Sequence, residues 1–98
     1  MRRGELWTYH PHGFTRQRTI VLISSDGIHE SPRPWLIAAE VMAEDPQDIL
    51  AVQLAPHGWV HAGNIGRIYR GWLAERVAET DTEVLERLDT ALRAAMDL

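Results

Sequence analysis

The sequence has 98 residues, no cysteine and a formal net charge of −4, and 45% of its residues are hydrophobic. This length suits one domain covering residues 1–98, and the lack of thiols excludes disulfides, thiolate metal sites and a cysteine nucleophile. All ten cationic residues are arginine, which excludes a phosphate-loop lysine and Schiff-base chemistry. Because no apolar run reaches about 20 residues and none follows the start, we expect a cytoplasmic protein that does not enter the membrane.

Short β-branched and aromatic runs, separated by turn residues, dominate the first three quarters of the chain. We expect strands over residues 5–9, 19–23, 35–42, 49–54, 59–61 and 64–69. The third run is rich in alanine, but Pro34 before it and Pro46 after it favour a strand over a helix. Asp26 and Gly27 predict a turn after the second run. Five or six short strands at this spacing indicate a small β-barrel in a β-rich α+β fold.

The C-terminal segment has the clearest helical pattern. Residues 80–83 read Thr-Asp-Thr-Glu, which predicts a capping box with the Thr80 hydroxyl as the N-cap. Apolar side chains then recur at spacings of one, three and four residues from Val84 to Met96. We therefore expect an α-helix over residues 81–96 that docks on the barrel by this stripe.

Positive charge is concentrated near the start of the chain. Residues 1–18 contain four arginines and one acid, whereas residues 73–98 contain three arginines and seven acids. An anionic ligand is therefore expected at the N-terminal segment. The alternative is that these arginines form only a solvated face.

The segment between the first two expected strands, residues 9–18, contains the groups needed to cleave RNA without a metal. The reaction requires a base for the 2′-hydroxyl, cations for the phosphorane and an acid for the 5′-oxygen. Arg16 and Arg18 offer the cations, and His10 and His12 offer the acid or base. The same side chains would also bind a phosphate without cleaving it. We expect no metal and no cofactor, because the histidine pairs 10/12 and 57/61 have no clear third ligand.

Several segments resemble the MazF/PemK family of toxin–antitoxin toxins, which are endoribonucleases also called mRNA interferases. The start R-G-E-L-W at residues 3–7 is similar to the family's first strand. The stretch R-T-I-V-L-I-S-S-D at residues 18–26 is similar to its R-P-x-V-V-x-S-x-D motif. Residues 36–39 resemble the third strand, residues 62–73 the segment before the last helix, and the tail matches in spacing.

This resemblance implies an SH3-like barrel with a C-terminal helix, a homodimer, cleavage of single-stranded RNA without metal, and inhibition by an antitoxin with an extended acidic tail. Arg18 matches the family's catalytic arginine and Gly13 the glycine of the preceding loop. We expect the catalytic residues to be Arg18, His12, Arg16 and His10. We expect the RNA-binding residues to be Arg3, Trp7, Gly13, Thr15 and Gln17.

The sequence departs from the family pattern at three places. Thr19 replaces the proline after the arginine, the loop acid is absent, and the strand-end Ser/Thr falls at Val41 or Met42. Either the loop histidines and Arg16 have taken over these roles, or the barrel binds RNA or antitoxin with weak or no catalysis. A CcdB-like gyrase-binding inhibitor is the remaining alternative within this fold.

The aromatic content also predicts self-association. A small chain buries only about two thirds of its unfolded surface, and four tryptophans, two tyrosines and one phenylalanine exceed what its core readily hides. We expect two tryptophans in the core and at least one at the interface of a homodimer.

Overall fold

The structure is a computed structural model that describes residues 1–13 and 16–97. Thr15, one of the expected RNA-binding residues, lies outside the described residues. Within the described part of the chain, no helix combines the length and apolar character needed to span a membrane.

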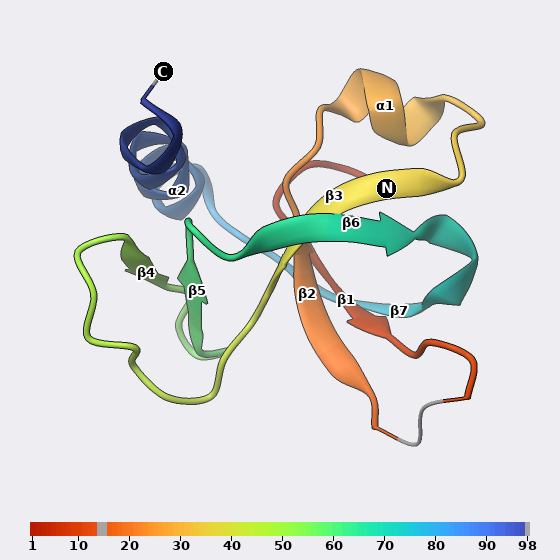
Figure 1. Cartoon of the computed structure of the whole chain (residues 1–98), viewed down its shortest axis with the longest axis horizontal. Coiled ribbons are helices and arrows are strands. Elements are labelled where there is room, and N and C mark those ends of the chain that lie inside the picture. The colour runs from red at the N-terminus through yellow and green to blue at the C-terminus, as the bar shows by residue number, and fades with distance from the viewer. Residues whose placement is uncertain (14–15, 98) are drawn as a thin grey trace.

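Five strands form the main sheet (Figure 1). Their order across the sheet is β6-β3-β2-β1-β7, and every neighbouring pair is antiparallel. The strands are β1 (Glu5–Tyr9), β2 (Arg18–Leu22), β3 (Trp35–Glu40), β6 (Ile65–Tyr69) and β7 (Leu73–Glu79). Strands β4 (Ala51–Gln53) and β5 (Trp59–His61) form a separate two-stranded sheet. Two helices, α1 (Asp26–Glu30) and α2 (Thr82–Met96), and the 3-10 helix Arg70–Trp72 complete the fold.

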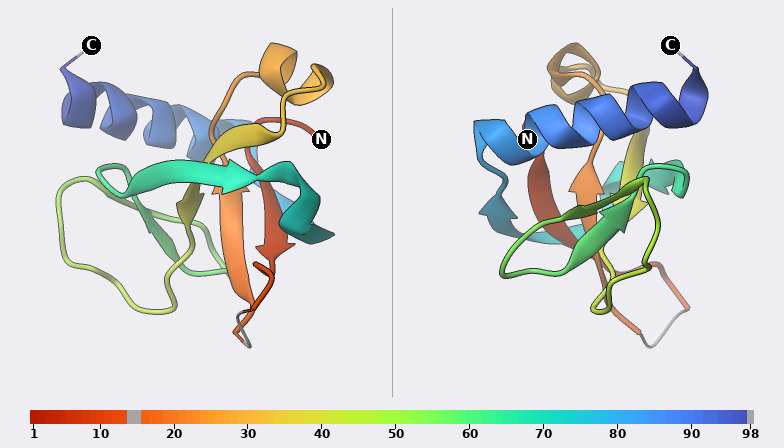
Figure 2. Two further views of the ribbon diagram at one scale, coloured as in Figure 1. Left: turned by 45° about the vertical axis from the view of Figure 1, so that its right-hand side comes forward. Right: turned by 90° about the vertical axis from the view of Figure 1, so that its left-hand side faces the viewer.

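The main sheet buries apolar side chains on both faces. Val21 and Ala39 belong to a core that also contains residues of β4, β5 and α2. Leu88 and Leu92 are the α2 residues buried most deeply in it. Alternate residues such as Ile20 and Leu22 point to a second core with Leu36 and Ile68. This alternation follows from the two-residue period of strands. In both views of Figure 2 the helix α2 passes above β4 and β5, and α1 lies on the same upper side of the molecule. One part of the second face is left open.

The six expected strands are all present, and the predicted β-rich α+β fold with a C-terminal helix is confirmed. In residues 1–13 and 16–97 the strands form two sheets that do not close into a barrel. A backbone bridge between Met42 and Trp59 links the two sheets. The described residues contain seven strands, one more than expected, and the additional strand is β7. Its sequence LAERVAE is mostly exposed on an edge of the sheet and shows no apolar alternation.

Two local predictions were wrong. Asp26 and Gly27 do not form a turn but begin α1, which Ser25 caps by accepting a hydrogen bond from the Ile28 amide. At the start of α2 the N-cap is Asp81, whose carboxylate accepts from the Val84 amide at 2.8 Å. The Thr80 hydroxyl instead donates to the Gly4 carbonyl at 3.0 Å. Thr80 therefore ties the last loop to the first strand and does not cap the helix.

The expectation of two core tryptophans was also wrong. Trp7, Trp59 and Trp72 are half-buried and Trp35 is 42% exposed. Trp7 and Trp72 pack against the edge of the second core. The aromatic surface is thus larger than the sequence predicted.

Candidate active site

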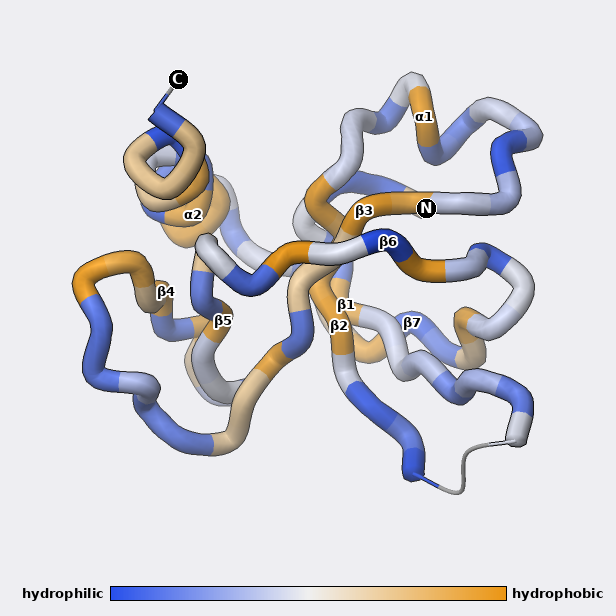
Figure 3. Tube along the Cα trace, viewed as in Figure 1, coloured by the Kyte–Doolittle hydropathy of each residue, from blue (hydrophilic) through white to orange (hydrophobic). Residues whose placement is uncertain are grey.

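Arg18 opens β2 at the end of the loop that joins the first two strands. Its Cα partner across the ladder is Tyr9, the last residue of β1. Figure 3 shows that the chain leading into β2 at this point is hydrophilic. The Arg18 side chain is exposed, and no carboxylate in the described ranges lies within ion-pair distance of it. The guanidinium is therefore available to an anionic ligand.

Arg18 and Tyr9 line a hollow with a volume of about 190 Å³ on the open part of the second face. The apolar floor comes from Ile20 of β2, Ala38 of β3 and Ile68 of β6. Gly66 lies directly opposite Ala38 in the β3–β6 ladder. A Cβ at Gly66 would have no atom within 4 Å, so the absent side chain leaves the hollow open on the β6 side.

The polar residues of the hollow come from four strands and one loop. Besides Arg18 and Tyr9 they are Glu40, Asn64 and Arg67. A hollow this size beside a guanidinium group suits one phosphodiester, because the Arg18 guanidinium can donate two parallel hydrogen bonds to phosphate oxygens. Glu40 and Arg18 together give the site both a proton acceptor and fixed positive charge.

Glu40 is the residue that the sequence analysis missed. It ends β3, is half-buried and is the Cα partner of Ile20. The positions matched to the family's strand-end hydroxyl have other roles: Val41 packs against the first core and Met42 pairs with Trp59. The alternation of side chains along a strand could have identified Glu40, since Leu36, Ala38 and Glu40 lie on the same face of β3. A carboxylate that continues a buried apolar face marks a polar site at the end of that face.

Arg16 does not line this hollow. It lies at a neighbouring hollow of about 440 Å³ formed with residues 40–46, to which Glu40 also contributes. Glu44 and Asp45 lie on that wall and are exposed. Glu40 thus separates the surroundings of Arg18 from those of Arg16.

The loop histidines lie toward the 3-10 helix that follows β6. The His10 amide donates to the Trp72 carbonyl at 3.0 Å. The His12 ring stacks on the Trp72 ring, with 5.9 Å between centroids and 30° between planes. None of the five histidines, all of which belong to the described residues, lines the hollow of Arg18. The predicted crowding of imidazoles around Arg18 is therefore not found. No three His, Asp or Glu side chains in residues 1–13 and 16–97 are grouped to hold a metal.

The remaining expected RNA-binding residues are dispersed. Arg3 is engaged at the far end of β2, where Nε donates to the Ile23 carbonyl at 2.7 Å and the guanidinium pairs with Asp89 at 2.5 Å. Gly13 adopts a φ of +86° in the loop, and Gln17 is exposed just before β2. Gly13 and Gln17 therefore lie on the loop that leads to Arg18, and Arg3 does not.

The R-G-E-L-W start forms a structural network around Glu5. The buried carboxylate accepts from the Arg2 amide at 2.9 Å, from Trp7 Nε1 at 3.1 Å and from Arg76 Nε at 2.9 Å. Burial alone would raise the pKa of Glu5, but these hydrogen bonds outweigh it and lower the pKa. Trp7 is therefore held by Glu5 and does not line the hollow, contrary to the expectation.

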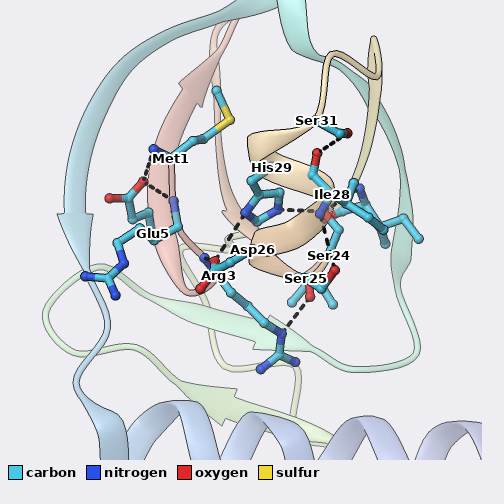
Figure 4. A network of polar contacts seen from close by, with 12 residues as sticks. Met1, Arg3, Glu5, Ser24, Ser25, Asp26, Ile28, His29 and Ser31 are labelled. Atoms are coloured by element: carbon cyan, nitrogen blue, oxygen red, sulfur yellow. Dashed lines mark hydrogen bonds and ion pairs between the residues drawn. The ribbon is translucent and has the colours of Figure 1, made fainter.

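A second polar cluster lies beside α1 (Figure 4). Ser24 Oγ lies 2.6 Å from His29 Nε2, and His29 Nδ1 lies 3.6 Å from the Asp26 carboxylate. The order of groups is that of a hydrolase triad, but Ser24 and His29 are buried. Ser24 Oγ also accepts from the Ile37 amide at 3.2 Å. We interpret this cluster as the attachment of α1 to β3.

The whole chain was compared with known proteins. No family model and no curated protein matches it. Solved structures do match. An endoribonuclease in complex with its cognate antitoxin, from a mycobacterial species, is 18% identical with a TM-score of 0.88, over 100% of this chain and 96% of that one. MazE–MazF from Deinococcus radiodurans is 20% identical with a TM-score of 0.84, over 100% and 96% of the two chains.

A third structure, the Mycobacterium tuberculosis toxin MazF-mt6, is 12% identical with a TM-score of 0.77, over 96% of this chain and 97% of that one. The matches run through the main sheet, the small sheet and the C-terminal helix. Along its entire length, this chain has the fold of the MazF toxins.

Proposed function

We propose that the protein is a toxin of a toxin–antitoxin system that cleaves single-stranded mRNA in the cytoplasm without a metal. The observation that carries this proposal is the unpaired Arg18 guanidinium, which shares a hollow with the Glu40 carboxylate. Structures with the same fold include an endoribonuclease and MazF toxins. At this low sequence identity these structures support the fold alone. The residues of the hollow support the proposed chemistry.

In the proposed mechanism, Arg18 binds the nonbridging oxygens of one phosphodiester. Glu40 accepts the proton of the 2′-hydroxyl, whose oxygen then attacks phosphorus. The bond from phosphorus to the 5′-oxygen breaks, which leaves a 2′,3′-cyclic phosphate. The departing 5′-oxygen takes a proton from a water molecule, and protonated Glu40 returns its proton to the resulting hydroxide. Arg18 stabilises the charge that develops on the phosphorane oxygens.

Glu40 takes the role that the sequence analysis gave to His12 and His10, because those imidazoles lie outside the hollow. Arg16 keeps a binding role in this proposal. At the neighbouring hollow it can contact the phosphate next to the cleaved one. Gly13, Thr15 and Gln17 belong to the same loop, and we propose that the loop contacts RNA on entry to the site.

The proposed partners are a second copy of the chain and an antitoxin. Two of the structures with this fold contain an endoribonuclease with its antitoxin or a MazE–MazF pair. An extended acidic tail would compete with RNA for Arg18 and Arg67, since carboxylates and phosphates bind guanidinium groups in the same way. Inhibition would then result from occupation of the hollow.

The test is incubation of the purified protein with a long unstructured RNA in the presence of EDTA. We expect fragments that carry 2′,3′-cyclic phosphate and 5′-hydroxyl ends, and no fragments with Arg18→Ala. A protein that binds RNA with a measurable Kd and leaves it intact would show the binding-only alternative, which the lack of a hydroxyl at Val41 and Met42 favours. Cleavage that stops when EDTA is added would contradict the metal-free mechanism.

A further inference from the structure

We propose that a row of rings along the β6 edge of the sheet binds the bases of single-stranded RNA that flank the cleaved phosphate. This ring row consists of Trp35, Tyr69, Trp72 and His12. The inference rests on the proposed function, since it concerns nucleotides on either side of the same hollow. It assigns a binding role to His12, which was predicted to act in acid–base catalysis, and to three aromatic residues that had no individual predicted role.

The rings form a continuous series. Trp35 and Tyr69 meet edge to face with centroids 5.4 Å apart, and Tyr69 meets Trp72 in the same way at 5.2 Å. His12 stacks on Trp72 at 5.9 Å. The sheet register explains the first pair, because Trp35 and Tyr69 are Cα partners in the β3–β6 ladder. Their arrangement is therefore fixed by the backbone before any ligand binds.

Both ends of the ring row are exposed, Tyr69 and Trp72 between them are half-buried, and one end carries a cation. Trp35 and its face neighbour Ile37 are each 42% exposed, and His12 is exposed. The Arg67 guanidinium lies over the Trp35 ring, 4.5 Å from its centroid. Aromatic faces next to arginine are the surface on which proteins stack unpaired bases, since every base offers a π-face whatever its sequence.

The ring row is continuous with the hollow at two points. Arg67 both lies over Trp35 and lines the hollow. Tyr9, which also lines the hollow, contacts Trp72 with 6.1 Å between ring centroids. A strand whose phosphate is bound by Arg18 therefore reaches the rings without leaving the protein surface.

The charge of this surface favours RNA over a second copy of the chain. No carboxylate among residues 1–13 and 16–97 lies within ion-pair distance of Arg67. A two-fold contact whose axis passes near Arg67 would bring this cation close to its own copy, which is unfavourable. A phosphodiester would instead neutralise the charge while its base stacks on the ring.

The test compares how well short and long RNAs bind. The probes are fluorescent pools of random sequence with 2′-O-methyl groups, which the proposed mechanism cannot cleave, about three or about nine nucleotides long. A third pool has the long backbone with abasic sites outside the central nucleotides. Fluorescence anisotropy gives the Kd of each pool for the native chain, Trp35→Ala, Trp35→Phe and Ile49→Ala. Ile49 is the control, since it is 96% exposed and lies beside the separate sheet.

We expect Trp35→Ala to weaken binding of the long pool about tenfold and to leave the short pool unchanged. Trp35→Phe should restore most of the loss, Ile49→Ala should change nothing, and wild type should bind the abasic pool about as weakly as Trp35→Ala binds the long pool. Equal affinity of wild type and Trp35→Ala for the long pool would overturn the inference. A second result would also overturn it: light scattering that shows wild type as a dimer and Trp35→Ala as a monomer, with RNA affinity unchanged. Trp35 would then be a subunit contact. If wild type binds none of the pools, the proposed function itself fails.

Discussion

Arg18 and Tyr9 are directly opposite each other in the β1–β2 ladder, and both side chains line the hollow of the candidate site. The hairpin therefore fixes the guanidinium at the mouth of the hollow, since the register of an antiparallel pair determines which side chains share a face. The opposite end of β2 is anchored by Arg3, which binds the Ile23 carbonyl and Asp89 of α2. The two arginines of the first strands thus have separate tasks, one in the site and one in the fold.

Glu40→Gln should lower kcat for RNA cleavage by about 10²-fold or more, because the amide cannot accept the 2′-hydroxyl proton. KM should change little, since the amide has nearly the same shape and still lines the hollow. Steady-state cleavage of a defined RNA measures both parameters. The matched control is Glu44→Gln, an exposed position on the neighbouring hollow. Equal rates for Glu40→Gln and wild type would remove Glu40 from the mechanism.

Gly66→Val should abolish cleavage while keeping the fold. A Cβ at this position meets no atom within 4 Å, so the added side chain enters the hollow without a clash. Valine also suits a strand better than glycine, and we expect Tm to stay level or rise. Thermal unfolding and RNA binding measure the two effects. Normal RNA affinity in a folded Gly66→Val protein would show that RNA binds elsewhere.

His29 should make the fold sensitive to acid. Burial lowers the pKa of His29 below its ordinary value of 6.5, an effect that Asp26 opposes and Arg70 reinforces. The unfolded chain therefore takes up a proton at a higher pH than the folded chain. The free energy of unfolding should be fully retained above about pH 6.5 and fall at lower pH, by at most about 1.4 kcal/mol per pH unit from this group.

Urea unfolding at a series of pH values measures this dependence. His29→Gln should reduce the slope below pH 6.5, and His57→Gln, which removes an exposed imidazole, should leave it unchanged. An unchanged slope in His29→Gln would assign the acid sensitivity to other groups.

Glu5→Gln should destabilise the fold by about 1–3 kcal/mol, because the buried carboxylate binds an amide, an indole and the Arg76 guanidinium. Glu79→Gln removes the other, exposed carboxylate that pairs with Arg76, and its cost should stay below about 1 kcal/mol. Chemical denaturation of both variants gives the comparison. Similar losses in the two variants would contradict the central role of Glu5 in the R-G-E-L-W start.

The strands and the C-terminal helix were predictable because their apolar residues follow the periods of strand and helix. β7 was not predicted, because it is an exposed edge strand without an apolar pattern. α1 was not predicted, because the sequence of a five-residue helix capped by Ser25 resembles that of a turn. Arg18 was found through its motif. Glu40, Arg67 and Gly66 were missed because the hollow joins residues from β3 and β6, and the sequence alone does not show which strands pair.

The most direct measurement is the single-turnover rate of cleavage by wild type, Arg18→Lys and Arg18→Ala on one RNA in EDTA. We predict that Arg18→Ala loses about 10²–10³-fold or more and that Arg18→Lys recovers only part of it, because an ammonium lacks the planar pair of donors. Circular dichroism should show all three proteins folded alike. Cleavage by folded Arg18→Ala at the wild-type rate would contradict the account.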